Sequence, residues 1–340
     1  MTFYPATVTF ELTNACNLRC KHCFSFAGEM LEDELKFNEI QTLLRELYDL
    51  GTMEIDFGGG EPLLRKDLLQ ILDTAQSLDF EMVILTNGTL LDDKIAKKLS
   101  NFSIKHVQIS VDGLKMAHEH LRGSGTFDPT IEAMKSLRNE GVKFVVRSTA
   151  TKESLRDIKK LADISVEFGA YQYGVVRFFP AGRGMAYKED LMLNANEMLM
   201  LHETIRDIDK KYGHKIEIKA DHCGFFEGEL FKELKESKTL ICPCAKTWCL
   251  IKPNGVVSPC EIATFYAGNV RKMGFKEIWE NAPIFRLFRG FKPELMKGNC
   301  SACQHKYICG GYCRALAILH NGDIYSEDFT CYHVMKKNHK

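Results

Sequence analysis

Short apolar runs alternate with amphipathic segments along the first half of the chain. Six runs rich in β-branched and aromatic residues predict strands, because such residues suit a half-buried pleated surface. Their positions are 7–12, 53–57, 82–85, 106–111, 143–146 and 174–179. The segments between them have the apolar spacing of helices, so the chain alternates strand and helix units.

Two of the intervening segments carry recognisable helix ends. In the first, Asn38 and Gln41 predict a capping pair, and Gly51 predicts the end of the helix. In the second, Asp128 stands before a proline at the predicted start, and Gly141 marks the predicted end. The inward positions of these two helices are Ile40, Leu43, Leu44, Leu47, Ile131, Met134 and Leu137.

The fold class that follows is α/β. Alternating strands and helices predict a parallel sheet with right-handed crossovers, doubly wound or barrel-like, built from six units rather than eight. Residues 240–340 differ, because strand signals at 250–252 and 256–258 flank a P-N-G turn and the rest is loop-rich. Such a segment needs metal clusters as its core. We expect one unit over 1–215, a connecting segment over 216–239 and a small cysteine-rich domain over 240–340.

Charge and hydropathy narrow the classes of function. Lysine plus arginine and aspartate plus glutamate number 45 each, so no positive surplus exists for nucleic acid or an anionic membrane. No signal-peptide pattern precedes the first strand, and no apolar run is long enough to span a membrane. We expect a cytoplasmic protein with no nucleic-acid or membrane partner.

The thirteen cysteines change the picture most. Their number is odd, and a cytoplasmic compartment is reducing, which favours metal ligation or catalysis over disulfides. Cys16, Cys20 and Cys23 stand in C-N-L-R-C-K-H-C, soon after the first strand. Three thiolates on one loop can hold three irons of a cubane cluster and leave the fourth iron open for chemistry. A zinc site or buried thiols are the alternatives.

This cysteine spacing resembles the signature of the radical S-adenosylmethionine (SAM) superfamily. The strand-end segments F-G-G-G-E-P, T-N-G and I-S-V-D-G resemble other motifs of the same family. The resemblance implies an incomplete, TIM-like (β/α)6 barrel and a [4Fe-4S] cluster whose open iron binds the methionine part of SAM. The residues that it implies for binding SAM are His22, Gly59, Gly60, Glu61, Asn87, Ser110, Asp112 and Arg122.

By this resemblance, Glu61 is expected to meet the methionine ammonium, and Arg122 or Arg147 its carboxylate. A solvated position is the alternative for both arginines, and an ordinary turn is the alternative for the polar residues that end the fourth strand. His118 and His120 are expected at a hydrated surface.

The later cysteines resemble the SPASM extension of radical SAM proteins. The pattern has one cysteine, a gap containing a glycine, a second cysteine, a closely spaced run and a final cysteine. The resemblance implies two auxiliary [4Fe-4S] clusters. One would take Cys300, Cys303, Cys309 and Cys331. The other would take Cys242, Cys260 and Cys313, with a fourth ligand or an open iron.

Cys249 is preferred over Cys244 as that fourth ligand, because seven residues from Cys242 allow a loop to close round a cluster more easily than C-P-C. Zinc is the alternative for the whole block, since thiolates at two-residue spacing serve it equally well. Cys223 has no partner spacing and is expected to be a buried small residue.

The resemblance implies a radical SAM oxidoreductase that cleaves SAM reductively to a 5′-deoxyadenosyl radical, which takes hydrogen from a substrate. A ribosomally made peptide undergoing thioether, carbon-carbon or decarboxylation chemistry is the expected substrate. The alternatives are a tetrapyrrole decarboxylase or deacetylase of a siroheme or heme pathway and a sulfatase maturase. A remote alternative from another class is an iron-sulfur electron carrier.

The expected partners are a peptide or small-molecule substrate and an electron donor such as flavodoxin or ferredoxin. Because only fifteen residues precede Cys16, any leader-peptide-binding domain is expected to be a separate protein. Glu261 directly follows Cys260 and is the expected general base, since forming a double bond requires a proton to leave. A solvated glutamate at a hairpin end is the alternative.

Overall fold

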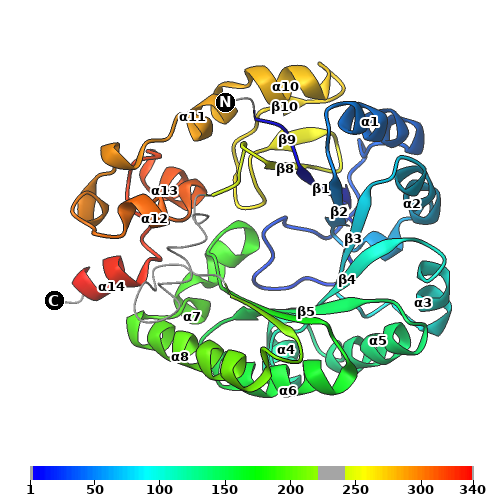
Figure 1. Cartoon of the computed structure of the whole chain (residues 1–340), viewed down its shortest axis with the longest axis horizontal. Coiled ribbons are helices and arrows are strands. Elements are labelled where there is room, and N and C mark those ends of the chain that lie inside the picture. Colours follow the sequence, from blue (N-terminus) through cyan, green and yellow to red (C-terminus); the bar gives the residue numbers. More distant parts are fainter. Residues whose placement is uncertain (1–2, 221–241, 339–340) are drawn as a thin grey trace.

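The computed structural model describes residues 3–220 and 242–338. Its strands form one sheet in the order β10-β9-β8-β1-β2-β3-β4-β5-β6-β7. Every neighbouring pair from β8 to β7 is parallel, and the sheet curls into a partial barrel (Figure 1). The strands are β1 (Thr7–Thr13), β2 (Glu54–Gly59), β3 (Glu81–Thr86), β4 (Ile104–Ser110), β5 (Phe144–Ala150), β6 (Gln172–Arg177), β7 (Glu217–Ala220), β8 (Trp248–Ile251), β9 (Val256–Ser258) and β10 (Gly268–Asn269).

The six expected strands are all present, and the α/β barrel class is confirmed. A further parallel strand, β7, lies in the segment that the sequence predicts as a connection. It has four residues that are alternately exposed and half-buried. Such a short edge strand carries no apolar run, so the sequence pattern does not reveal it.

Helices cover the outer face of the barrel (Figure 1). Those of the barrel are α1 (Phe37–Asp49), α2 (Leu68–Ser77), α3 (Asp93–Leu99), α4 (Lys115–Arg122), α5 (Phe127–Asn139), α6 (Ile158–Phe168), α7 (Lys188–Leu191) and α8 (Ala195–Tyr212). Later come α10 (Phe275–Asn281), α11 (Pro283–Arg289), α12 (Lys306–Cys309), α13 (Arg314–Asn321) and α14 (Tyr332–Asn338). Short 3-10 turns are η1 (Pro62–Leu64), η2 (Leu155–Asp157), η3 (Gly182–Tyr187), η4 (Pro293–Leu295) and η5 (Gly298–Cys300).

The first helix shows how closely the pattern predicts an element. Its buried face consists of Ile40, Leu43, Leu44 and Leu47, as expected. The helix starts earlier than a capping pair of Asn38 and Gln41 predicts, because the Glu39 carboxylate accepts the backbone N–H of Lys36 at 2.8 Å. The apolar face was therefore predictable and the cap was not.

The C-terminal part joins the barrel through β8. This strand pairs with β1 in parallel, with Trp248 opposite Thr7, and β9 and β10 continue antiparallel. The predicted P-N-G turn connects β8 to β9, and Gly255 in it has φ of +81°, which favours glycine. The hairpin thus extends the barrel sheet, and the boundaries of the three expected segments stay a prediction.

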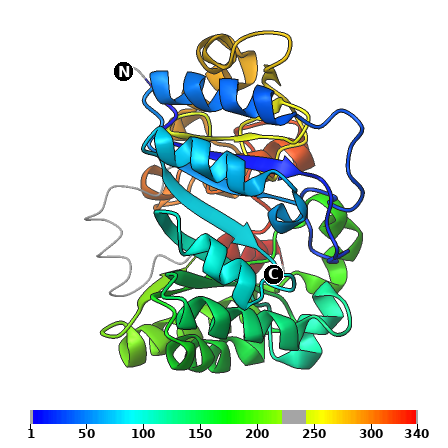
Figure 2. The same ribbon diagram turned by 90° about the vertical axis from the view of Figure 1, so that its right-hand side faces the viewer.

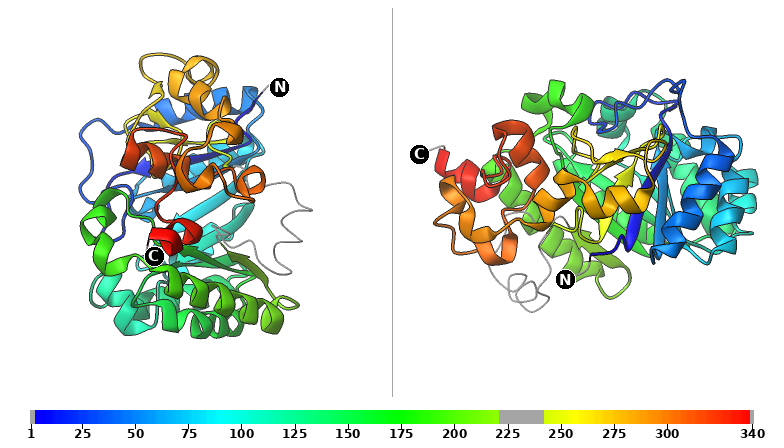
Figure 3. Two further views of the ribbon diagram at one scale, coloured as in Figure 1. Left: turned by 90° about the vertical axis from the view of Figure 1, so that its left-hand side faces the viewer. Right: turned by 90° about the horizontal axis from the view of Figure 1, so that it is seen from above.

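The C-terminal segment that ends in α14 lies along one flank of the barrel (Figure 3), where α14 contacts α8. Figure 2 shows the long loop between β1 and α1 reaching η3, where the Arg183 backbone N–H donates to the carbonyl oxygen of Cys23 at 2.9 Å. No helix within residues 3–220 and 242–338 is long and apolar enough to cross a bilayer.

Candidate active site

One cavity of about 780 Å³ lies inside the barrel. The N-terminal cysteine group, Cys16, Cys20 and Cys23, lines one part of it. A second set lines another part, and we call it the proximal cysteine group: Cys242, Cys244, Cys260 and Cys313. Thiols from the N-terminal and C-terminal parts of the chain therefore line one cavity.

The loop that carries the N-terminal cysteine group is folded by backbone contacts. The Cys16 N–H donates to Gly28 at 2.8 Å, and the Gly60 N–H donates to the carbonyl oxygen of Thr13 at 2.7 Å. A side chain at position 60 would place its Cβ 2.1 Å from the carbonyl oxygen of Ala15. The glycine run after β2 is therefore needed for the two strand-end loops to approach each other.

Glu61 lies behind this cavity and does not line it. Its carboxylate accepts hydrogen bonds from the Thr86 hydroxyl at 2.8 Å, the Asn87 N–H at 2.9 Å and the Leu63 N–H at 3.2 Å. Burial raises the pKa of Glu61 to about 7, although these hydrogen bonds lower it. The structure thus places the Glu61 carboxylate among loop ends, where its oxygens already accept three hydrogen bonds.

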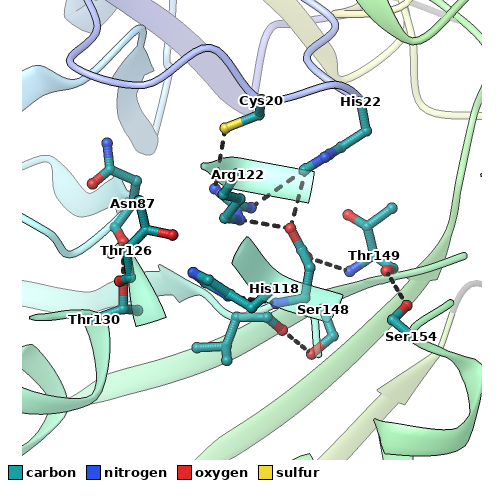
Figure 4. A network of polar contacts seen from close by, with 12 residues as sticks. Cys20, His22, Asn87, His118, Arg122, Thr126, Thr130, Ser148, Thr149 and Ser154 are labelled. Atoms are coloured by element: carbon teal, nitrogen blue, oxygen red, sulfur yellow. Dashed lines mark hydrogen bonds and ion pairs between the residues drawn. The ribbon is translucent and has the colours of Figure 1, made fainter. Parts of the chain in front are cut away.

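Asp112 is the centre of a buried polar network, and Figure 4 shows its partners Arg122, His22 and Thr149, with Cys20 beside Arg122. Its carboxylate accepts from Arg122 Nε at 2.6 Å and from the Thr149 N–H at 2.7 Å, and His22 Nε2 lies 3.1 Å away. Burial alone would raise the pKa of Asp112, but Arg122 and His22 hold it well below its usual range. The network brings three expected SAM-binding residues together, with Asp112 and Arg122 already paired to each other.

Other expected residues occupy different positions. Asn87 lines the cavity and its amide nitrogen lies 4.0 Å from the Cys16 sulfur, while Ser110 lines the cavity at the end of β4. Arg147 also lines the cavity and is partly buried. The expectation for His118 is wrong: its side chain is fully buried, and its Nδ1 accepts the N–H of Asp112 at 3.3 Å. The side chain of His120 is half-exposed, as expected.

The structure brings Cys244 into the proximal group and leaves Cys249 outside it. Cys244 interacts with the side chains of Cys242 and Cys260. Trp248 on β8 lines the cavity, and neighbouring residues on a strand point to opposite faces. Cys249 therefore points outward, where burial raises the pKa of its thiol and Arg289 lowers it. The seven-residue spacing alone could not reveal this direction.

The distal cysteine group consists of the thiols that line a second, smaller cavity: Cys300, Cys303, Cys309 and Cys331. Within residues 3–220 and 242–338, no three cysteine, histidine or acidic side chains converge as a single metal ion requires. Four thiols spaced around a small cavity instead fit the donor set of a cubane cluster. Cys223 lies outside the described residues.

Glu261 lines the main cavity next to Cys260. Burial, together with the charges of Glu11 and Asp56, raises its pKa to about 7, although Arg147 lowers it. Glu11 and Asp56 line the same cavity and were missed in the sequence. Their signal is a charged residue at an inward position of a strand that is otherwise apolar.

Comparisons with known proteins agree with this arrangement. The family model of the radical SAM superfamily matches residues 10–164, and that of an iron-sulfur cluster-binding domain, SPASM, matches residues 242–304. The chain is 32% identical to the AdoMet-dependent heme synthase of Methanosarcina barkeri, over 97% of both chains. It is 31% identical to the mycofactocin maturase MftC of Mycobacterium tuberculosis, over 92% of this chain and 78% of that one.

A solved structure shares the fold at lower identity. Streptococcus suis SuiB bound to its precursor peptide SuiA superposes with a TM-score of 0.80 at 21% identity. The match covers 97% of this chain and 76% of SuiB.

Proposed function

Because the chain belongs to the radical SAM superfamily and carries the SPASM domain, we propose that it oxidatively modifies a ribosomally made peptide. The chain is a radical SAM oxidoreductase with one SAM-binding and two auxiliary [4Fe-4S] clusters. When bound, the SAM-binding cluster and SAM supply a 5′-deoxyadenosyl radical, which takes hydrogen from a substrate carbon.

The observation that carries the proposal is the single cavity shared by the N-terminal and proximal cysteine groups. A substrate inside it would lie between the residues that would hold the SAM-binding cluster and those that would hold an auxiliary cluster. The N-terminal cysteine group would hold the first cluster, and the proximal and distal groups would hold the auxiliary clusters.

We assign Cys244 as the fourth ligand of the proximal group, in place of Cys249. Glu261 keeps its proposed role as general base. It stands beside Cys260 in the cavity, and a carboxyl with a pKa of about 7 takes up a proton readily near neutral pH. Glu261→Gln should leave 5′-deoxyadenosine formation intact and reduce product by about 100-fold or more.

A peptide suits the cavity better than a molecule with many carboxylates. Glu11, Asp56 and Glu261 line it, and the Arg122 guanidinium, which also lines it, is paired with Asp112. Burial raises the pKa of all three carboxyl groups, and the negative charge of nearby propionates would further oppose their ionisation. MftC is named a maturase, and SuiB is described as bound to its precursor peptide. A separate leader-binding protein and a flavodoxin or ferredoxin electron donor belong to this proposal.

A tetrapyrrole side-chain decarboxylase is the second candidate. The AdoMet-dependent heme synthase matches the chain over nearly its full length. Reconstituted enzyme, SAM and reductant should be incubated with a peptide encoded beside the gene and, separately, with Fe-coproporphyrin III. Substrate-dependent loss of hydrogen from the peptide supports the proposal, whereas carbon dioxide release from the porphyrin alone supports the second candidate.

The cluster assignment has its own test. Replacing Cys16, Cys20 and Cys23 by alanine should abolish reductive cleavage of SAM and leave about eight of about twelve irons per chain. Continued formation of 5′-deoxyadenosine above the enzyme-free rate would overturn the assignment of this group.

A further inference from the structure

Arg177, the last residue of β6, is buried where the barrel meets the C-terminal segment, with 3% of its surface exposed. A guanidinium stays charged at any ordinary pH, so its burial requires partners. Its Nη1 donates to the carbonyl oxygen of Thr330 at 2.9 Å, and its Nη2 lies 3.3 Å from Oδ2 of Asp328. One barrel residue thus binds the segment that immediately precedes Cys331.

The same aspartate reaches the proximal cysteine group. Asp328 Oδ2 accepts the backbone N–H of Cys313 at 3.4 Å, and its Oδ1 accepts the N–H of Thr330 at 2.9 Å. Cys313 belongs to the proximal group and Cys331 to the distal group. The pair of Arg177 and Asp328 therefore connects one cysteine of each auxiliary group.

Tyr312 forms the wall between the two cavities, since it lines both of them. The Arg177 guanidinium carbon lies 4.7 Å from the centre of the Tyr312 ring and 4.5 Å from that of Phe179. The two rings stack with their centres 6.1 Å apart. Tyr312 has φ of +56°, a strained conformation for an aromatic residue. The guanidinium and the stacked ring hold it there.

We propose that the Arg177–Asp328 pair positions the proximal and distal cysteine groups relative to each other and sets the reduction potentials of both auxiliary clusters. The inference rests on the ligand assignment proposed above. A positive charge near a cluster stabilises its reduced, more negative state, and a carboxylate has the opposite effect. Water screens neither charge effectively, because both are buried. Arg177 therefore raises the potentials and Asp328 lowers them.

The test is a charge cycle of Arg177→Gln, Asp328→Asn and the double variant, each made in the full chain loaded with clusters. Midpoint potentials are measured by EPR-monitored redox titration. The same titration in a chain with the N-terminal cysteine group replaced by alanine identifies the auxiliary signals. Arg177→Gln should lower the auxiliary potentials by the equivalent of about tenfold in the reduction equilibrium, which is about 59 mV for one electron. Asp328→Asn should raise them, and the double variant should lie between.

Structural damage would not shift the auxiliary potentials in opposite directions in the two single variants. The inference is overturned if both single variants shift the potentials in one direction, or if neither shifts them at full iron content. If the Arg177→Gln variant does not bind its clusters, the direction in which Asp328→Asn shifts the auxiliary potentials decides the test alone. Arg65→Gln removes a largely buried arginine paired with Asp67 on the barrel, and it should leave the auxiliary potentials unchanged.

Failure of the ligand assignment is recognised separately. It would appear as an iron content near four per wild-type chain, before any variant is compared.

Discussion

Cys244 and Cys249 are five residues apart in the sequence, but their side chains lie on opposite sides of β8. Cys244 interacts with other thiols inside the cavity, whereas Cys249 is fully buried in the outer layer. Arg289, which lowers the pKa of the Cys249 thiol, packs on the rings of Trp279 and Phe285 in that layer. The direction of a side chain on β8 thus separates a proposed cluster ligand from a packing residue.

Replacing each thiol in turn tests this distinction. Cys244→Ala should remove or labilise one auxiliary cluster and so lower the iron content by about four per chain. Cys249→Ala, the matched control, should keep the full iron content, because it deletes one buried sulfur from an apolar layer. Iron quantification and EPR measure both. Equal iron loss in the two variants would contradict the assignment of Cys244.

The role of Glu61 likewise depends on which groups its carboxylate contacts. Glu61→Gln replaces an acceptor of three hydrogen bonds with an amide, and it should cost about 1–3 kcal/mol of unfolding free energy. Denaturant unfolding of the loaded protein measures this cost. SAM affinity of the folded protein should change little. Weakened SAM binding at unchanged stability would instead return Glu61 to the ammonium site.

The same variant should change the pH dependence of stability. The folded-state pKa of Glu61 is raised to about 7 from an ordinary value of 4.5. The wild type therefore loses stability as pH rises through this window, because ionisation is disfavoured in the fold. Glutamine does not titrate, so the cost of the substitution should shrink between about pH 5 and pH 8. A cost that stays constant across this range would contradict burial as the cause.

At the scale of elements, the active site depends on loops that pass within contact of each other. The loop after β2 crosses the cysteine loop at Gly60, where even one methyl group would overlap the Ala15 carbonyl. The glycine run is therefore a spacing element for the N-terminal cysteine group.

Gly60→Ala should displace the cysteine loop and lower SAM-binding cluster content while leaving the auxiliary clusters in place. About four of about twelve irons, together with SAM cleavage, should be lost. Gly51→Ala is the control, because no atom lies within 4 Å of the added Cβ, although φ of +80° makes that site strained as well. If Gly60→Ala retains the full iron content and activity, the cysteine loop does not require close contact with the loop after β2.

The sequence was sufficient for the first six strands and for most of the thiols. Apolar runs predicted those strands, and cysteine spacing predicted the cysteines that line the two cavities, except for the preference of Cys249 over Cys244. The direction of a side chain was not predictable from the sequence, since the thiols of Cys244 and Cys249 lie on opposite sides of β8. Nor was long-range pairing, because nothing in a four-residue strand such as β7 or β8 shows which edge it joins.

At the scale of the whole molecule, the strands that the structure describes form one continuous sheet. β8, from the cysteine-rich part, covers the edge of β1, and the outer helices α10 and α11 pack with the barrel in the same core. The C-terminal part therefore completes the barrel as well as carrying clusters.

A fragment ending at Ala220 should not fold as a stable monomer. It would expose the β1 edge, where Val8 and Phe10 are fully buried in the whole chain, and unpaired edges of this kind associate. Analytical ultracentrifugation after anaerobic refolding should show aggregates, with the full chain as the control. A monomeric fragment with native-like circular dichroism would show that the barrel is independent.

The pairing of β1 with β8 also sets the order in which the protein can mature in a cell. β1 is made first, yet its outer neighbour follows about 240 residues later. At about 5–20 residues per second, synthesis leaves that edge open for on the order of 10–50 s. The nascent chain therefore passes through a long period in which its first thiols exist without a finished barrel around them. Cluster insertion that requires the closed cavity must wait until translation is nearly over.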